Sequence, residues 1–472
     1  MQMKRLEFGD SLSGLLIDGV DGTPYVGATI LMTQERGITV EVPYLPDPSI
    51  EQFNHVLTWF RDQSPPSNML FATRDGTISL FDVVWSGQTE TWDGSRTSVG
   101  TLRPTVTAFG VRPGPLEPPL VIEELRSRLD GLNEWSRLSC VEQKNGLNEA
   151  NKVRSVEMHI QQNDGLTWRQ GEVTMAIRAG WRYSTSEDGY NRLISLQDNA
   201  FIESSSDSGQ MPFLDHLIEQ RKVANLMVFL FGLPLSFREH NLRDELFATS
   251  TSKRPEIEVV SSYSYRERRN EVPTPKKLGR PLAHMAQIGS EGLEAWSENY
   301  ETWKRFILPS AGALGNPASF LEDIIVSTSM SIEAAGVIIG ERPGERETWS
   351  RARNPKPTTA TYAFRCLDVL DAHWPDPIAD RVSLARAVAN NYNDVKHFDR
   401  GDFPQHDESH VVSEVNQMIV RLLAICLTGK EKELLTPYRR DGGFHEIQQM
   451  LDAYTLSLDK GGKWKRASDK QL

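Results

Sequence analysis

The sequence predicts an α+β multidomain protein, in which a β-rich, sandwich-like N-terminal domain precedes an all-helical C-terminal domain. Three observations predict this architecture. The chain has 472 residues, more than one hydrophobic core usually organises. The first 200 residues are dominated by short β-branched and aromatic segments bounded by turn residues. After Pro212 the apolar residues recur at the spacing of an α-helix instead.

The predicted strands are rich in β-branched and aromatic residues, and two of them alternate loosely with a period of two. Their ranges are Gly37–Val42, Thr77–Trp85, Val153–Ile160 and Val173–Tyr183. Arg74-Asp75-Gly76 predicts a turn before the second strand, because glycine supplies a positive φ. Such spacing indicates a sandwich or a strongly bent antiparallel sheet. Between the strands, Val121–Leu132 is predicted to be a short helix.

A long helix is predicted over Phe213–Phe231, where apolar side chains keep helical spacing until a glycine and a proline stop it. The following segment, Ser250–Pro281, is polar, basic and interrupted by prolines, with one predicted strand at Glu256–Ser262. We therefore place the first domain at residues 1–285 and the second at residues 286–472.

The second domain is predicted to be an up-and-down helical bundle, because its helices are joined by short connections. The predicted helices are Leu293–Ile307, Ala318–Gly340, Thr358–His373, Ile378–Phe398, Val411–Gly429 and Phe444–Leu456. A charged segment without a predicted helix, Glu341–Pro357, interrupts this series of helices.

Composition argues against several classes of protein. The net charge of −12 is unsuited to coating nucleic acid through bulk electrostatics. Three distant cysteines match no metal-ligand spacing and indicate a reducing, cytoplasmic location. We find no signal peptide, and the longest apolar run, Leu226–Leu235, is about half a membrane span. Two basic stretches, Arg266–Arg280 and Lys460–Arg466, are either a solvated linker and a frayed tail, respectively, or phosphate contacts for an RNA.

One predicted helix presents a polar stripe beside its apolar one. The polar residues are separated by four, three and four positions, and they are Arg386, Asn390, Asn393 and His397. The apolar stripe includes Leu384 and Val388 and can face the bundle core. A lone histidine at a helix C-terminus often has only a structural role, because a cation there is favoured by the helix dipole. Two asparagines in line with it are less expected on a purely structural helix, because asparagine is a poor helix former.

A second candidate site follows this helix. His406 and His410 are four residues apart and lie near Asp402 and Asp407, an arrangement that a metal ion can use. No glycine-rich phosphate loop, serine–histidine–aspartate arrangement or zinc pattern accompanies it. We therefore expect the polar stripe to carry the chemistry, with no metal and no organic cofactor.

The end of this helix resembles a known signature. Tyr392-Asn393-Asp394-Val395-Lys396-His397-Phe398-Asp399-Arg400-Gly401 is similar to the motif of HEPN domains, specifically the ApeA-like branch. That motif is an arginine, usually followed by a polar residue, and a histidine four to six residues later. The first half of the chain resembles the ApeA N-terminal domain in Leu15-Leu16, Leu132-Asn133-Glu134-Trp135 and Gly232-Leu233-Pro234-Leu235. Together the two resemblances cover nearly the whole chain.

The resemblance implies a metal-independent endoribonuclease. His397 would act as general base or acid on a ribose 2′-hydroxyl that attacks the adjacent phosphate, which restricts the reaction to RNA. Tyr392 or Asn390 takes the place of the motif arginine, depending on the spacing allowed, and Asn393 lies between them and the histidine. A cation is still needed to hold the phosphate. The alternatives for that cation are Lys396, Arg400 and Arg386.

The same resemblance implies the biological setting. HEPN domains pair through their motif helices, so we expect a homodimer or higher homo-oligomer. The expected function is bacterial anti-phage defence by abortive infection, with an RNA substrate, tRNA being one candidate. The N-terminal domain would act as a sensor or regulator that responds to an unknown phage-derived trigger. The alternative is a catalytically inactive HEPN-fold module that binds RNA or a protein.

Overall fold

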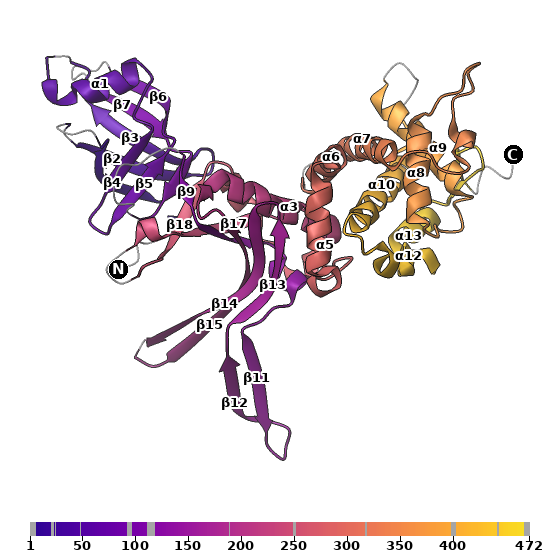
Figure 1. The fold of residues 1–472 in the computed structure, drawn as a ribbon, viewed down its shortest axis with the longest axis horizontal. Helices are drawn as coiled ribbons and strands as arrows, with labels where there is room; N and C mark the ends of the chain where they lie inside the picture. Colours follow the sequence, from indigo (N-terminus) through magenta and orange to yellow (C-terminus); the bar gives the residue numbers. More distant parts are fainter. Residues whose placement is uncertain are drawn as a thin grey trace. The chain divides into compact units, whose positions relative to one another are not determined.

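The computed structural model describes residues 6–19, 23, 25–47, 49–91, 97–110, 119–187, 189–248, 252–316, 319–397, 403–440 and 443–466 (Figure 1). The chain divides into two compact units. The first unit consists of residues 1–133, 138–220 and 236–273, and the second of residues 134–137, 221–235 and 274–472. A large antiparallel sheet followed by a helical region confirms the predicted α+β multidomain fold.

The first unit is built on one antiparallel sheet, which has 14 strands among the described residues. Their spatial order is β13-β14-β15-β10-β17-β18-β8-β5-β4-β1-β2-β3-β7-β6. The strands are β1 Ser11–Ile17, β2 Val26–Thr33, β3 Gly37–Tyr44, β4 Asn68–Ala72, β5 Thr77–Phe81, β6 Val84–Thr91, β7 Thr97–Arg103, β8 Val106–Ala108, β10 Glu124–Leu129, β13 Asn163–Gln170, β14 Val173–Glu187, β15 Arg192–Ser206, β17 Phe237–Arg243 and β18 Glu256–Ser261. A short ladder joins β9 (Val121–Ile122) to β16 (Met211–Pro212).

The alternation of side chains along the strands builds the core of this unit. In β2, every second residue from Val26 to Met32 is buried, which places four apolar side chains on one face. The helix α1 (Asn54–Arg61) packs its Phe60 ring against Tyr44 of β3, with ring centroids 5.1 Å apart. A Cβ at Gly100 of β7 would come within 2.0 Å of the Phe60 ring, so glycine permits this close approach.

Two hairpins extend from the first unit (Figure 1). The first arm, residues 141–160, consists of β11 (Val141–Leu147) and β12 (Val153–Ile160), which form a separate two-stranded sheet. The second arm, residues 181–198, is the outer part of β14 and β15, where these strands pair only with each other among the described residues. Asp198 accepts a hydrogen bond from the Cys140 backbone N–H at 3.1 Å, which ties the base of the first arm to the second.

Two predictions for the first unit were wrong. The helix predicted over Val121–Leu132 is instead two consecutive strands, β9 and β10. In β10, Leu125 and Leu129 alternate with the half-buried Arg126 and Arg128 on the opposite face, which is the pattern of a strand. The short helix α2 (Leu132–Ser136) begins only at the end of that range. The strand predicted over Thr77–Trp85 is divided into β5 and β6 at Asp82, whose φ of 50° interrupts extended backbone.

The helix α3 (Phe213–Phe231) has the bounds that the sequence predicts. Gly232 ends it with a φ of 73°, the left-handed conformation that glycine adopts without strain. Arg421 of α10 (His406–Cys426) donates hydrogen bonds to the carbonyls of Phe229 and Leu230 at 2.9 and 3.1 Å. These bonds satisfy carbonyl groups that a helix C-terminus otherwise leaves unpaired.

The second unit is mostly helical. Its remaining elements are α4 Pro275–Leu278, α5 Met285–Tyr300, α6 Lys304–Leu314, α7 Leu321–Ile339, α8 Thr359–Leu370, α9 Arg381–Lys396, α11 Glu431–Leu434, α12 Thr436–Arg440, α13 His445–Ala453, β19 Leu456–Leu458 and β20 Trp464–Arg466. Helices α7, α8, α9 and α10 pack on one another and bury an apolar core. The helix predicted over Leu293–Ile307 is wrong, because a turn at residues 301–303 separates α5 from α6. No helix in the described ranges is long and apolar enough to span a bilayer.

Candidate functional site

The helix α9 presents the polar stripe that its sequence indicates. Asp380 caps its N-terminus by accepting a hydrogen bond from the Ser383 backbone N–H at 2.7 Å. Leu384 and Val388 are fully buried in the bundle, as their spacing predicts. Arg386 is half-buried on a different side of the helix, so α9 separates a core face from a polar face.

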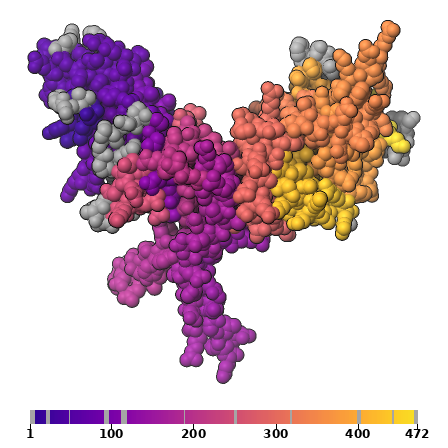
Figure 2. Space-filling view, viewed as in Figure 1, coloured from indigo at the N-terminus to yellow at the C-terminus, as the bar shows by residue number. Residues whose placement is uncertain are grey.

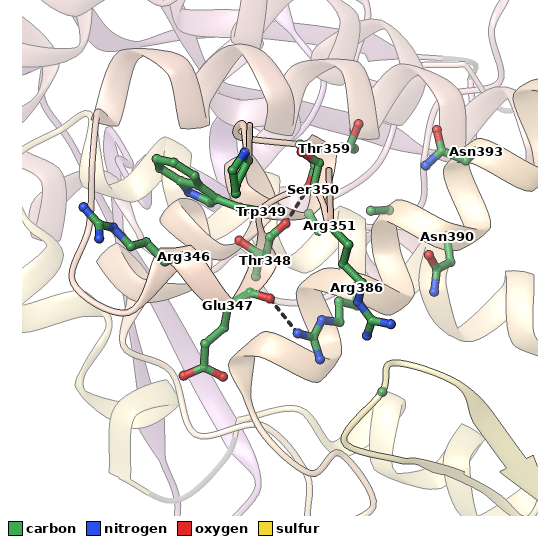
Figure 3. A pocket seen from close by; sticks show the side chains of 15 residues that line it. Arg346, Glu347, Thr348, Trp349, Ser350, Arg351, Thr359, Arg386, Asn390 and Asn393 are labelled. Atoms are coloured by element: carbon green, nitrogen blue, oxygen red, sulfur yellow. Dashed lines mark hydrogen bonds between the residues drawn. The ribbon is translucent and has the colours of Figure 1, made fainter. Parts of the chain in front are cut away.

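A cavity of about 860 Å³ lies along this polar face (Figure 3). Its walls come from α9, the first turn of α8, the segment that follows α7, and the loop between β19 and β20. The lining residues are Arg346, Glu347, Thr348, Trp349, Ser350, Arg351, Pro355, Thr358, Thr359, Ala360, Arg386, Ala389, Asn390, Asn393 and Gly461. Polar side chains and backbone from four separate segments therefore converge on one space.

The lining of this cavity is strongly cationic. Arg346, Arg351 and Arg386 line it, and Glu347 is the single acidic residue among its described lining. Arg386 donates hydrogen bonds to the carbonyls of Glu347 at 2.6 Å and Lys460 at 3.0 Å, which fix its guanidinium. A guanidinium carries five N–H donors, so further donors of Arg386 stay available to a ligand. Such an arrangement favours an anion with several acceptor oxygens.

The N-terminus of α8 adds positive potential to the same cavity. Thr358 caps this 12-residue helix in a reciprocal pair with Thr361, and Thr359 and Ala360 of the first turn line the cavity. Backbone N–H groups at a helix N-terminus carry partial positive charge. The Thr359 hydroxyl donates a hydrogen bond to the Glu333 carboxylate at 2.5 Å, and this bond holds the Thr359 side chain in place.

A buried ion pair fixes the cavity wall that follows α7. Glu345 and Arg365 form two hydrogen bonds, at 2.7 and 2.9 Å, and both side chains are buried. Glu345 also accepts bonds from the Arg342 backbone at 2.9 Å and the Trp349 indole at 3.3 Å. The hydrogen bonds from Arg365 lower the pKa of the Glu345 carboxyl to about 2, despite the opposing effect of burial. The wall is therefore anchored through a carboxylate that stays ionised.

A second cavity of about 310 Å³ lies on the adjoining side of α9. It shares Asn390 and Asn393 with the larger cavity and adds Lys463 and Trp464 from the end of the chain. The basic stretch at residues 460–466 therefore contributes to the walls of both cavities. Asn390 and Asn393 of α9 thus lie between the cationic cavity and a second cavity whose lining includes Lys463 together with Asp394 and Glu408.

The structure brings together some of the sequence-predicted residues and separates others. Arg386 and Asn393 line the large cavity together with Asn390. His397 follows the last helical residue of α9, and its backbone N–H bonds the Asn393 carbonyl at 2.9 Å. Its side chain is half-buried and is not part of the described cavity lining.

The other predicted residues lie elsewhere. Tyr392 is buried, with only 2% of its surface exposed, so it faces away from the polar stripe. The Lys396 ammonium lies 3.3 Å from the Tyr392 hydroxyl and 5.2 Å from the centre of its ring. Arg400 lies outside the described residues.

Sequence reasoning missed the wall that faces α9. Arg346, Trp349 and Arg351 belong to the segment over residues 341–357. The sequence indicates only that this segment is charged. Its arginines alternate with acidic residues, so the local charge gives little signal. The Thr358 cap at the start of a predicted helix was the available indication that this segment faces a structured site.

The alternative metal site is engaged in other contacts. His410 Nδ1 lies 2.8 Å from the Tyr454 hydroxyl, and Asp407 pairs with Arg466. The His406 and His410 rings are 6.1 Å apart. Within the described ranges, no group of three histidine, cysteine or acidic side chains is arranged to hold a metal ion. Asp402 lies outside those ranges.

Comparison with known proteins gives one match. Residues 21–299 match the family described as ApeA N-terminal domain 1, which covers more than half of the chain. The matched range includes the large sheet apart from β1, together with α3 and most of α5, and it ends before α9. No curated protein and no solved structure matches the chain.

Proposed function

Because the chain belongs to the ApeA N-terminal domain 1 family, we propose that it is an anti-phage defence protein whose helical unit is a metal-independent HEPN-type endoribonuclease. The observation that carries the nuclease proposal is the cationic cavity on α9. Its lining residue Asn393 precedes His397 by about one helical turn. The first unit would sense a phage-derived trigger and regulate the helical unit. Family membership supports the defence role, and the geometry of α9 supports the chemistry.

The proposed reaction uses the RNA itself as nucleophile. His397 takes the proton of a ribose 2′-hydroxyl, whose oxygen then bonds to the adjacent phosphorus. The bond from phosphorus to the 5′-oxygen breaks, and that oxygen takes a proton from a second acid. The products are a 2′,3′-cyclic phosphate and a free 5′-hydroxyl. In a homodimer paired through α9, the same histidine of a second copy supplies the second acid.

The cavity beside His397 would hold the phosphates. A phosphodiester gains negative charge in its transition state, and fixed cationic donors stabilise that charge without reorganising. Arg386 is held by two backbone carbonyls and lies in the stripe that ends at His397. It is therefore the cation that we assign to the missing motif arginine, with Lys396 and Arg400 as the alternatives.

The direct test mixes the purified full-length chain with total RNA in EDTA. We expect fragments that end in 2′,3′-cyclic phosphate, because the proposed chemistry takes its nucleophile and protons from RNA and protein groups. The EDTA-treated and magnesium-supplemented reactions serve as the matched pair. RNA binding without fragments in both reactions would contradict the nuclease and favour a catalytically inactive RNA-binding module.

Arg386→Ala is expected to slow this cleavage by about 10- to 100-fold, the usual worth of a hydrogen bond to a charged group. Single-turnover cleavage measures the effect, with Lys396→Ala and Arg400→Ala compared under the same conditions. Arg305→Ala changes an exposed arginine of α6 and provides the matched control. A larger loss in Arg400→Ala than in Arg386→Ala would transfer the phosphate contact to Arg400.

A further inference from the structure

The smaller cavity on α9 is lined by two residues with buried polar atoms that have no hydrogen-bond partner within the described part of the chain. These atoms are the Asn391 side-chain oxygen and the Trp464 indole nitrogen. Asn391 is only 4% exposed, and its amide nitrogen donates to the Ser409 hydroxyl at 3.1 Å, which fixes its orientation. A buried polar atom without a partner is destabilising. A ligand that bonds both atoms would remove this cost.

Two carboxylates add acceptors to this cavity. Glu408, in the first turn of α10, and Asp394 of α9 both line it, and Glu408 is the more buried of the two. The Glu408 carboxylate accepts no hydrogen bond from a described residue. Burial, together with the nearby Asp407, raises the pKa of Glu408. The cavity is therefore rich in acceptors that N–H groups of a ligand would satisfy.

The turn between β19 and β20 forms a fixed wall of the cavity. It packs directly on α9, because a Cβ at Gly462 would come within 2.4 Å of the Arg386 Cβ. Asp459 closes the turn by accepting hydrogen bonds from the backbone N–H groups of Gly461 and Lys463, at 2.8 and 3.0 Å. Figure 2 shows the end of the described chain, in yellow, against the orange helices of this unit. A preorganised wall loses little conformational freedom when a ligand binds.

The cavity adjoins the cationic cavity that we assign to phosphates. Asn390 and Asn393 of α9 line both (Figure 3), so one ligand can occupy the two together. A nucleotide has this composition, with an anionic phosphate next to a neutral base that carries N–H donors. A volume of about 310 Å³ is at the lower end of the usual range for small-ligand sites, which suits one base and excludes a duplex.

Guanine matches this lining better than the other three bases of RNA. Its Watson–Crick edge places two donors, N1–H and the N2 amino group, next to one acceptor, O6. Adenine and cytosine have one amino donor on that edge, and uracil has one N–H. Resting on the proposed nuclease function, we infer that the smaller cavity binds an unpaired guanine of the RNA substrate. The Glu408 carboxylate accepts both guanine donors, and the Trp464 indole N–H donates to O6.

Binding of RNA that cannot be cut tests this assignment separately from catalysis. The probes are 2′-O-methyl uridine nonamers with one central guanine, inosine, adenine or cytosine, and each is titrated with the full-length chain. The guanine probe should bind about 10- to 100-fold more tightly than the adenine and cytosine probes, the usual worth of a hydrogen bond to a charged group. Inosine lacks only the N2 amino group of guanine, so its probe should bind about tenfold more weakly than the guanine probe.

Glu408→Gln tests the residue that we assign to guanine. The substitution keeps the size of the side chain but replaces one acceptor with an amide donor, so the preference for guanine over inosine and adenine should be lost. Glu446→Gln is the matched control, because Glu446 is an exposed acidic residue in the first turn of α13. This control should keep the full preference. The inosine comparison uses the unsubstituted chain, so it decides the question even if Glu408→Gln does not fold.

The outcomes separate this inference from the proposed nuclease. Equal affinity for all probes, tighter binding of the adenine or cytosine probe, or an unchanged preference in Glu408→Gln would overturn the guanine site. Fragments of total RNA with no guanine enrichment at any position near the cut would also overturn it, while leaving the nuclease intact. A guanine preference in binding without fragments from unmodified RNA would contradict the nuclease alone. Neither binding nor cleavage would contradict both.

Discussion

His397→Ala is expected to lower the rate of RNA cleavage by about two to four powers of ten, the usual loss when a general acid–base group is removed. If a second copy supplies the same histidine as the acid, the substitution removes both proton-transfer groups at once. The residual rate should lie near the lower end of what the assay detects. Single-turnover cleavage of RNA in EDTA measures the effect.

The stability of the variant separates catalysis from folding. His397 lies half-buried after the last turn of α9, where its side chain has little packing to lose, so the melting temperature should change little. His445→Ala is the matched control, because His445 is also at a helix end and is exposed. Full activity of His397→Ala at unchanged stability would remove the nuclease proposal and leave a binding module.

Arg365→Ala is expected to lower the free energy of unfolding of the helical unit by about 3–5 kcal/mol, since it leaves the buried Glu345 carboxylate unpaired. The loss has a local consequence, because Glu345 also accepts hydrogen bonds from the indole of Trp349, which lines the cavity, and from the Arg342 backbone N–H. Thermal and denaturant unfolding measure the change. Any RNA cleavage should fall with it, because the cationic lining loses its support.

The same ion pair predicts how stability depends on pH. The pKa of Glu345 is about 2 in the folded protein and about 4.5 when unfolded, so the folded state favours the ionised form. The contribution of this carboxylate, about 3 kcal/mol, is fully present above pH 4.5 and is lost as pH falls through 2. In Arg365→Ala, the free energy of unfolding of the helical unit should therefore fall less steeply as the pH is lowered from 4.5 to 2.

The ion pair between Arg342 and Asp368 provides the control for this prediction. Its atoms are 2.7 Å apart, but Arg342 is 38% exposed, so solvent screens the attraction. Arg342→Ala should change stability by less than about 1 kcal/mol. Equal losses from Arg342→Ala and Arg365→Ala would contradict the special role of the buried pair.

The sequence predicted some elements of this fold because local signals were sufficient. The helix over residues 213–231 has apolar residues at helical spacing and ends at Gly232 and Pro234, so its bounds follow directly. The segment at residues 121–132 was predicted wrongly because its apolar residues fit helical and strand spacing alike. Pairing with the distant strands β15 and β17 makes this segment a strand, and one such contact joins Arg126 to Glu203, 77 residues away in the chain.

The candidate site was predictable on one side only. The spacing of Arg386, Asn390 and Asn393 along α9 indicated a shared polar face, and all three line the cavity. The facing wall depends on the distant pairing of Glu345 with Arg365, for which the sequence has no local pattern. Contacts that link remote segments are set by tertiary packing, so spacing along a single helix does not reveal them.

The interleaving of the two units along the chain limits how the protein can be divided. Residues 221–235 belong to the helical unit, although residues 236–273 of the first unit follow them. Phe229 from this stretch packs on Trp296 and Phe306, with ring centroids 6.1 and 5.8 Å apart. A proteolytic cut or an alternative translation start within residues 236–273 therefore cannot release a complete helical unit. A product that starts before residue 221 keeps residues 221–235 of the helical unit only by also keeping residues 236–273 of the sheet unit, so the helices cannot be produced without part of the first unit.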